Sequence, residues 1–403
     1  MKDNNNALTL TILTTLYLLH NVPVIGYYTP AVLFLVITIL LYFALVLAIG
    51  QAYFSKILLL AFPVVSIPFL RLLLVLFVGE HAFTLEVYSF VQVLIYPLLG
   101  LYIMKSKNYA FCRVLFIILI MAYAITAVTT IIGCRMYPNA ARALTGSQED
   151  TALYSQYKQM NIGDFHFVYF ITLTLPLLIG SIRYQAIGRT KGLLLAFLVL
   201  VTVYYSAYTT ALLFCILAVF LLFVPKDSSW KSLILLSIVG VIVVFAARIF
   251  ISNLFSYASE SVANEDVASR LADISALFVG ETADQLGDAS DTGLRLKLFE
   301  RSWQVFADNP IFGSWSLKAV GGHSFIFDTL GLFGIVGLFC IIWMYIRSFR
   351  LFLAPFKHKS WFVFLLTSYL FIIVQAILNP QPTINVLSFI LPMYACLMDK
   401  EKK

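Results

Sequence analysis

The sequence is poor in charged residues and in cysteine. Only 12% of the 403 residues are charged, roughly half of the share in an ordinary soluble domain. The five cysteines include no C-x-x-C pair, so neither a disulfide framework nor a metal site is predicted. The absence of a Walker loop argues against ATP hydrolysis by this chain. The composition excludes a soluble enzyme, a disordered protein and a nucleic-acid-binding module, in spite of the net charge of +7.

Long apolar runs are what the sequence has in abundance. Apolar residues make up 61% of the chain, and the mean hydropathy is +0.92. A helix that crosses a bilayer needs roughly 20 mostly apolar residues. Candidate spans lie near residues 7–24, 31–50, 57–78, 87–104, 114–132, 166–182, 192–207, 208–224, 232–249, 323–346, 361–378 and 383–398. The sequence therefore predicts an all-α polytopic membrane protein with about 12 transmembrane helices.

The segment 192–224 is ambiguous, because its length suits either one long tilted helix or two short helices that turn near Ser206. The distribution of charge favours two helices, with both termini cytoplasmic. In that arrangement the short outer loops contain no lysine or arginine. With one helix, nine positive residues of the later inner loops and the tail would lie outside, which the positive-inside rule disfavours. They are Lys226, Lys231, Arg347, Arg350, Lys357, Lys359, Lys400, Lys402 and Lys403.

This topology divides the chain into five parts. They are residues 1–133 with helices one to five, 134–164 as a first long extracytoplasmic loop, 165–249 with helices six to nine, 250–322 as a large extracytoplasmic loop, and 323–403 with the last three helices. Because both long loops lie on the same side, the protein is expected to act there. Asp164 is expected to cap the sixth helix.

The large outer loop begins acidic and then becomes amphipathic. Between Glu260 and Asp291 it carries eight carboxylates and a single arginine, which predicts a solvated acidic face. Residues 265–278 and 292–310 place apolar side chains at helical spacing, so two amphipathic helices are predicted. The second of these also has a basic side.

A glycine pair, Gly321 and Gly322, then leads into His323, which is expected in the first turn of a membrane helix. A helix N-terminus attracts phosphate and keeps a histidine neutral. Arg295 and Arg301 on the preceding helix have the fork geometry that suits phosphate oxygens. These residues could form a diphosphate and proton-transfer site, but an interfacial histidine with surface arginines explains them equally well.

The run 292–340 reads R-x5-R-x-W, then D-N-P-I-F-G-S, then G-G-H-S-x3-D-x-L-x3-G-I-x-G-L. It resembles the C-terminal signature of the O-antigen ligase and polymerase family, which includes the Wzy-type polymerases. The resemblance implies a GT-C-like membrane fold. It also implies glycan transfer from undecaprenyl-diphosphate-linked donors at the outer face of the bacterial cytoplasmic membrane, without metal or cofactor. The H-S pair, where ligases commonly have H-N, is more typical of a polymerase.

The resemblance also implies roles for individual residues. Arg295 or Arg301 would hold the donor diphosphate, and His323 would activate the acceptor hydroxyl. Family members often carry a Ser-Arg pair where a mid-chain helix starts at the outer surface, and this chain has no arginine at 205–210. Arg71, inside the third span, is our candidate for the missing arginine, with a structural ion pair as the alternative.

Two further residues are open to more than one interpretation. Asp328 is a candidate catalytic residue, but it could equally orient a neighbour or be a buried structural acid. Arg142, in the first long loop, is predicted to be a solvated charge, with diphosphate contact as the alternative.

Three functions are compatible with these features. A polymerase of O-antigen or capsule repeat units is favoured, and a ligase that uses a lipid A-core acceptor follows. A flippase or transporter is disfavoured, because only Arg71 and Asp328 are ionisable within spans and the large outer loop has no role in transport. The expected partners are the lipid-linked oligosaccharide, membrane lipid and a candidate chain-length regulator protein, with no nucleic acid.

Overall fold

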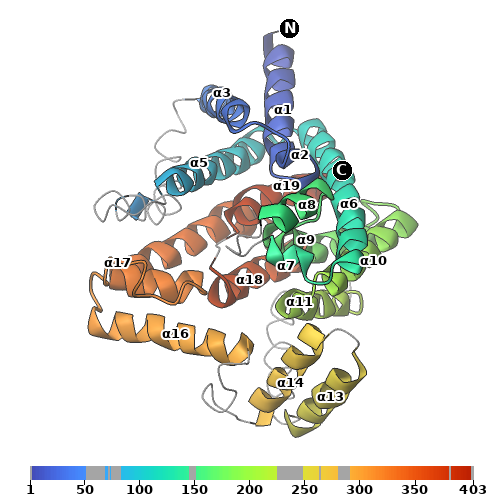
Figure 1. Ribbon diagram of the computed structural model, residues 1–403. Coiled ribbons are helices and arrows are strands. Elements are labelled where there is room, and N and C mark those ends of the chain that lie inside the picture. Colours follow the sequence, from blue (N-terminus) through green and yellow to red (C-terminus); the bar gives the residue numbers. More distant parts are fainter. Residues whose placement is uncertain are drawn as a thin grey trace.

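The computed structural model describes residues 2–50, 69–70, 73, 83–144, 151–224, 248–262, 265–279, 291–380 and 383–400, and in these residues it contains helices and no strand (Figure 1). The longer helices are α1 (Lys2–His20), α3 (Ala31–Ile49), α5 (Phe83–Ser106), α6 (Tyr109–Met136), α9 (Phe165–Arg183), α10 (Arg189–Tyr205), α11 (Thr209–Phe220), α13 (Arg248–Ser261), α14 (Glu265–Val279), α16 (Asp291–Asp308), α17 (Phe325–Ser348), α18 (Phe362–Leu378) and α19 (Leu391–Lys400). The short elements are α2 (Pro23–Gly26), α7 (Ala140–Ala143), α8 (Thr151–Gln159), η2 (Phe349–Leu353), η3 (Ala354–Phe356) and η4 (Val386–Ile390). The all-α prediction is confirmed for this part of the chain.

Several of these helices are suited to a membrane. Four are long and apolar enough to cross one, namely Val32–Ile49, Tyr109–Met136, Phe165–Arg183 and Phe325–Phe356. Shorter apolar helices at Ala7–His20, Thr209–Phe220, Phe362–Leu378 and Val386–Asp399 also coincide with predicted spans. A multi-pass membrane protein is therefore supported. The total of 12 spans stays a prediction, because most of 57–78 and of 232–249 lies outside the described residues.

The ambiguous middle segment forms two helices. Helix α10 ends at Tyr205 and α11 begins at Thr209, and Ala207 between them has a positive φ of 55°. A right-handed helix does not continue through a left-handed residue. The Tyr208 hydroxyl donates a 3.1 Å hydrogen bond to the carbonyl of Ala141 and so ties this turn to α7. The two-helix interpretation from charge is confirmed.

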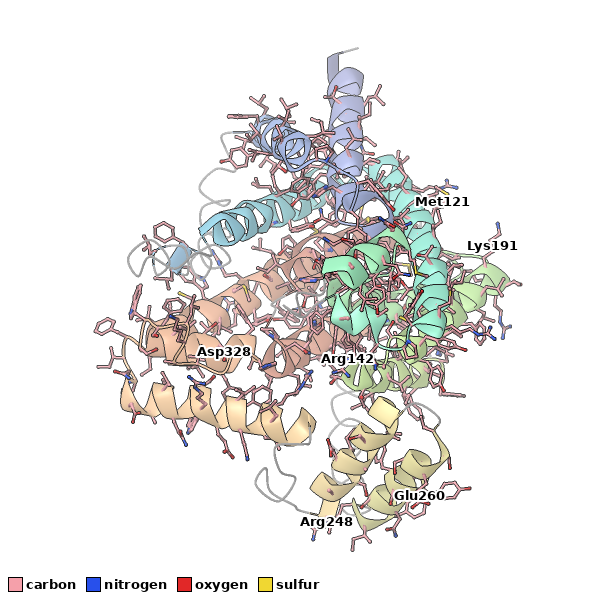
Figure 2. The ribbon with its side chains drawn as sticks, viewed as in Figure 1. Met121, Arg142, Lys191, Arg248, Glu260 and Asp328 are labelled. Carbon is pink, nitrogen blue, oxygen red and sulfur yellow. The ribbon has the colours of Figure 1, made fainter. Side chains whose placement is uncertain are left out.

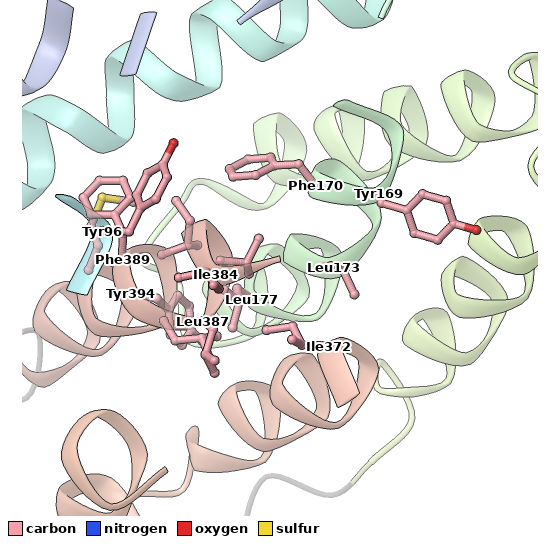
Figure 3. Close-up of a cluster of buried hydrophobic side chains, with 14 of the residues drawn as sticks. Tyr96, Tyr169, Phe170, Leu173, Leu177, Ile372, Ile384, Leu387, Phe389 and Tyr394 are labelled. Atoms are coloured by element: carbon pink, nitrogen blue, oxygen red, sulfur yellow. The ribbon is translucent and has the colours of Figure 1, made fainter. Parts of the chain in front are cut away.

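Helix α9 lies at the centre of the helical packing. Of its apolar window 83% is buried, against 33% for the corresponding windows of α3 and α6. It packs against α10, α11 and α18, and Ser368 of α18 donates a hydrogen bond of 2.5 Å to the carbonyl of Leu173. Figure 3 shows Phe170 and Leu173 of α9 among the buried side chains of the last helices, such as Ile372. Residues on α9 are therefore held on a rigid frame.

The N-terminus of α9 is capped as predicted. Asp164 Oδ1 accepts a 3.1 Å hydrogen bond from the amide of Phe167, and its Oδ2 lies 3.3 Å from Nδ1 of His166. Burial alone would raise the pKa of Asp164, but the hydrogen bond and charge of His166 and the nearby amides hold this pKa below its usual value. The cap fixes where the central helix starts.

The large outer loop contains both predicted amphipathic helices and one more. The predictions at 265–278 and 292–310 correspond to α14 and α16, whereas α13 at the start of the loop had not been predicted. Helices α13 and α14 pack on each other, and the Ser252 hydroxyl donates to the carbonyl of Ser275 at 2.9 Å. Helix α16 packs along α17, and α13 and α14 lie at the end of the molecule away from the N-terminus (Figure 1).

Candidate functional site

The helix that carries Asp328, α17, is broken at Gly334. This glycine has φ of 60° and ψ of −146°, a conformation that side-chain-bearing residues adopt only with strain. A Cβ at this position would lie 2.4 Å from the carbonyl oxygen of Ile311. The amide of Ile335, just after the break, donates a 2.8 Å hydrogen bond to the carbonyl of Pro310. The break therefore lets the loop that follows α16 dock against the backbone of α17.

The docked loop also satisfies the carbonyls that the break leaves free. The amide of Ser314 donates to the carbonyl of Gly331 at 2.9 Å, and that of Trp315 donates to the carbonyl of Leu332 at 3.1 Å. Such carbonyls at a helix break need partners from outside the helix. Gly313 has φ of 73°, and a Cβ there would meet the Leu332 backbone at 2.2 Å. Close packing of the two backbone segments thus explains why the motif has glycine at position 313, within I-F-G-S, and at position 334.

Asp328 joins α16, the glycine pair and the start of α17. Its Oδ1 accepts hydrogen bonds from the Ser302 hydroxyl at 2.7 Å and from the amide of Gly322 at 3.1 Å. Its Oδ2 accepts from the amide of Ser324 at 2.9 Å. The Ser302 oxygen in turn accepts from the amide of Gly321 at 2.8 Å. The carboxylate thereby fixes the backbone on both sides of residue 323, which favours the orienting role among the alternatives for Asp328.

His323 lies just before α17 and not in its first turn, where the sequence had placed it. The helix begins at Phe325, because Ser324 has an extended backbone and its hydroxyl caps the helix by accepting from the amide of Phe327 at 3.1 Å. His323 itself is half-buried. The neighbouring Gly322 has φ of 75° and no atom within 4 Å of an ideal Cβ position, so space is open beside this loop.

The buried side chain of Tyr169 lies near two arginines from distant parts of the chain. Tyr169 of α9 is 2% exposed, and its hydroxyl lies within electrostatic range of Arg295 on α16 and of Arg142 on α7. The side chains of Thr210 and Asn379 are within hydrogen-bonding reach of the same hydroxyl. Figure 2 shows Arg142 on the side of the molecule that faces α16. This arrangement concentrates positive charge near the N-terminal end of α9.

Arg301 has a different environment from Arg295. Its Nε donates a 2.8 Å hydrogen bond to the carbonyl of Ala319, and a terminal nitrogen donates to the carbonyl of Lys318. Six residues of α-helix turn the chain by about 600°, so the two arginines point about 120° apart. Arg301 therefore holds the loop before the glycine pair. Between the two arginines predicted to bind diphosphate, the geometry favours Arg295.

Polar side chains near Tyr169 lack hydrogen-bond partners. Thr209 Oγ1 and Gln375 Nε2 are buried and have no hydrogen-bond partner among the described residues, and the buried Asn379 Nδ2 forms no hydrogen bond of ordinary geometry there. The Asn379 carbonyl accepts a 2.9 Å hydrogen bond from the amide of Phe325, which places Asn379 beside the start of α17. An unsatisfied buried polar group typically costs about 1–3 kcal/mol. Amide and hydroxyl groups of this kind are able to exchange hydrogen bonds with a polar ligand.

Residues 192–315 match the family model for O-antigen ligase. The match confirms the resemblance read from the sequence and supports assignment to the O-antigen ligase and polymerase family. No curated protein and no solved structure matches the chain.

The matched segment of the O-antigen ligase family covers part of the site described above. It runs from α10 to the docked loop and includes Arg295 and Arg301. It ends before His323 and Asp328, so the roles of these two residues stay predictions. Arg71 lies outside the described residues. Among the described residues, no group of three or more histidine, cysteine, aspartate or glutamate side chains is arranged to hold a metal ion.

Arg142 and Ser302 have positions in the site that the sequence did not predict. Arg142 was expected to be a solvated loop charge, yet it is half-buried and faces Tyr169. Because α7 is a single turn in an irregular loop, the sequence has no helical periodicity there from which the partial burial of Arg142 could be predicted. Ser302 lies on the apolar side of an amphipathic helix, where a small polar residue gives no signal of its own. Its role becomes visible only when α16 packs on α17.

Proposed function

We propose that this member of the family is a polysaccharide polymerase that joins undecaprenyl-diphosphate-linked oligosaccharide repeat units at the outer face of the bacterial cytoplasmic membrane. The observation that carries the proposal is the convergence of Arg295 and Arg142 on Tyr169, beside the start of the helix that follows His323. Two guanidinium groups offer charged, directed donors that suit a diphosphate. The unsatisfied amide and hydroxyl groups nearby suit the hydroxyls of a sugar.

The proposed reaction uses His323 as the general base. The acceptor hydroxyl loses its proton to His323 as its oxygen forms a bond to the anomeric carbon of the donor. The bond from that carbon to the diphosphate breaks, and the lipid diphosphate leaves with the electron pair. Arg295 and Arg142 stabilise the charge that develops on it. Asp328 does not contact the reacting atoms in this scheme and instead positions the histidine loop.

A second candidate is the O-antigen ligase, which performs the same transfer onto a lipid A-core acceptor. The family model that matches residues 192–315 is that of O-antigen ligase, which favours this candidate. The H-S pair at His323 and Ser324 favours the polymerase, because ligases commonly have H-N there. The chemistry of the site is shared, so the acceptor must be identified by experiment.

The deciding experiment is incubation of the purified full-length protein with a defined lipid-linked repeat unit, with and without a lipid A-core acceptor. A polymerase yields a ladder of products from the repeat unit alone. A ligase yields a product only when the lipid A-core is present. If neither product forms while the protein moves the lipid-linked unit across vesicle membranes, the proposal is wrong and the transporter alternative stands.

A further inference from the structure

A groove runs along α9 between α6, α10 and the last helices. One part is an apolar cavity of about 120 Å³ lined by residues such as Tyr123, Ala124 and Phe170. The adjoining part is a cavity of about 450 Å³. The two parts share four lining residues, Phe116, Ile120, Ser181 and Leu195, so they form one groove.

Two positively charged side chains line the larger part of the groove. Arg113 near the start of α6 and Lys191 near the start of α10 both line it, and both are exposed. Neither forms an ion pair with a carboxylate among the described residues. The acid nearest in sequence to the groove lining is Asp399, whose carboxylate lies 2.6 Å from the amine of Lys359 and is therefore neutralised. The mouth of the groove is thus positively charged, and Figure 2 shows Lys191 on the same flank as Met121, which also lines it.

The charged mouth and the transfer site lie at opposite ends of α9. Ser181 lines the groove and Tyr169 marks the transfer site, and twelve residues of α-helix separate them by about 18 Å along the axis. The positive-inside pattern predicts that the mouth faces the cytoplasm, because Arg113 and Lys191 belong to the predicted inner loops. A ligand at the mouth would therefore sit in the leaflet opposite to the donor substrate.

We infer that this groove binds an anionic diacyl phospholipid. Its phosphate would lie between Arg113 and Lys191, because paired cations at a membrane surface recognise anionic headgroups. One acyl chain would enter the apolar part beside Ala124 and Phe170, where the lining is almost free of polar groups. A zwitterionic lipid lacks the net negative charge that the mouth selects. The bound lipid would fill the groove and so stabilise the packing of α6 and α10 around α9.

Native mass spectrometry of the detergent-purified full-length protein tests this inference. The protein is titrated separately with phosphatidylglycerol and phosphatidylcholine of the same acyl chains. We expect phosphatidylglycerol to bind at least tenfold more tightly. The double variant Arg113→Gln/Lys191→Gln should lose at least tenfold in affinity for phosphatidylglycerol and leave phosphatidylcholine unchanged. The single variant Lys191→Gln, at an exposed position, should lose less affinity for phosphatidylglycerol. It replaces the double variant in the test if the double variant does not fold.

Two controls separate the groove from general surface charge. Arg350→Gln/Lys357→Gln removes two exposed cations that line neither cavity, and it should bind phosphatidylglycerol like the wild type. Ala124→Phe fills the apolar part without changing charge, and it should weaken both lipids. The inference is overturned if Arg113→Gln/Lys191→Gln binds phosphatidylglycerol normally, if the two lipids bind equally to the wild type, or if undecaprenyl phosphate displaces phosphatidylglycerol at equal concentration.

Discussion

Ser302 on α16 and Asp328 on α17 are joined by a hydrogen bond of 2.7 Å between the serine hydroxyl and Oδ1 of the carboxylate. The bond links the amphipathic helix of the outer loop to a predicted membrane helix. Because the same carboxylate accepts amides on both sides of residue 323, the position of the histidine depends on how these two helices pack.

This relationship predicts that Asp328 positions the histidine loop. Asp328→Ala should lower the transfer rate by about ten- to a hundredfold, since hydrogen bonds to a charged group contribute about 1.5–3 kcal/mol. Donor affinity should change little, because the carboxylate does not face the arginines. Steady-state kinetics with a lipid-linked repeat unit measure both quantities. Asp308→Asn, which changes an exposed acid at the end of the neighbouring helix α16, is the matched control. A large rise in the donor KM with an unchanged kcat would contradict the positioning role.

The two arginines of α16 should behave differently. Arg295→Ala and Arg142→Ala should each weaken donor binding by about ten- to a hundredfold, because each removes a charged donor to the diphosphate. Arg295→Lys should restore only part of the affinity, since the fork geometry is lost. Arg301→Ala should mainly lower the melting temperature, because Arg301 holds backbone carbonyls. Equilibrium binding of a labelled donor, compared with thermal melts, distinguishes the two effects. Equal loss of donor affinity in the Arg301 variant would show that the assignment of Arg295 is wrong.

His323 should be required for chemistry and not for binding. His323→Gln keeps the approximate size and a hydrogen-bonding group but cannot accept the proton, so transfer should fall by about 10²–10⁴-fold. Donor binding should persist because the arginines are intact. His358→Gln changes an exposed histidine far along the chain and should retain wild-type activity. Polymer at a near wild-type rate from His323→Gln would limit this residue to positioning the acceptor.

Gly334→Ala should destabilise the protein. The new Cβ would lie 2.4 Å from the Ile311 carbonyl at a residue with positive φ, and backbone strain of this kind costs about 1–3 kcal/mol. A lower melting temperature and a smaller yield of folded protein are expected. Gly188→Ala is the matched control, since no atom lies within 4 Å of its Cβ position. Equal melting temperatures for the two variants would mean that the loop after α16 does not dock as described.

Cysteine labelling in intact cells tests the predicted orientation. Glu260 in α13 and Gly188 before α10 are both exposed. Of the five native cysteines, Cys112, Cys134, Cys215 and Cys340 are buried and Cys396 is half-buried, so the unsubstituted protein is the background control. Glu260→Cys should react with an impermeant maleimide from outside, and Gly188→Cys should react only after the membrane is opened. The opposite pattern would place the proposed site in the cytoplasm.

The sequence alone determined the class of the protein and the approximate positions of most of its helices. Apolar runs long enough to cross a bilayer can hardly form anything but helices there, because every backbone group must be satisfied within the segment. Helical periodicity was also enough to predict α14 and α16, since one face of each is apolar. The order of residues from Arg295 to Gly337 was enough to predict a resemblance to the O-antigen ligase and polymerase family, whose O-antigen ligase model matches residues 192–315.

The tertiary structure decided which of the candidate residues meet. Arg295 and Arg301 are indistinguishable in the sequence. Only the packing of α16 places Arg295 near Tyr169 and Arg301 against the backbone of residues 318–319. Arg142 and Tyr169 approach each other across separate elements, and no local pattern encodes such a contact. His323 lies before α17, and not in its first turn, because Ser324 caps the helix. The position of Ser324 depends in turn on Asp328, whose carboxylate accepts a hydrogen bond from the Ser324 amide. Local propensity and periodicity act within one element, whereas a site is built by contacts between elements, and these are fixed only when the helices pack.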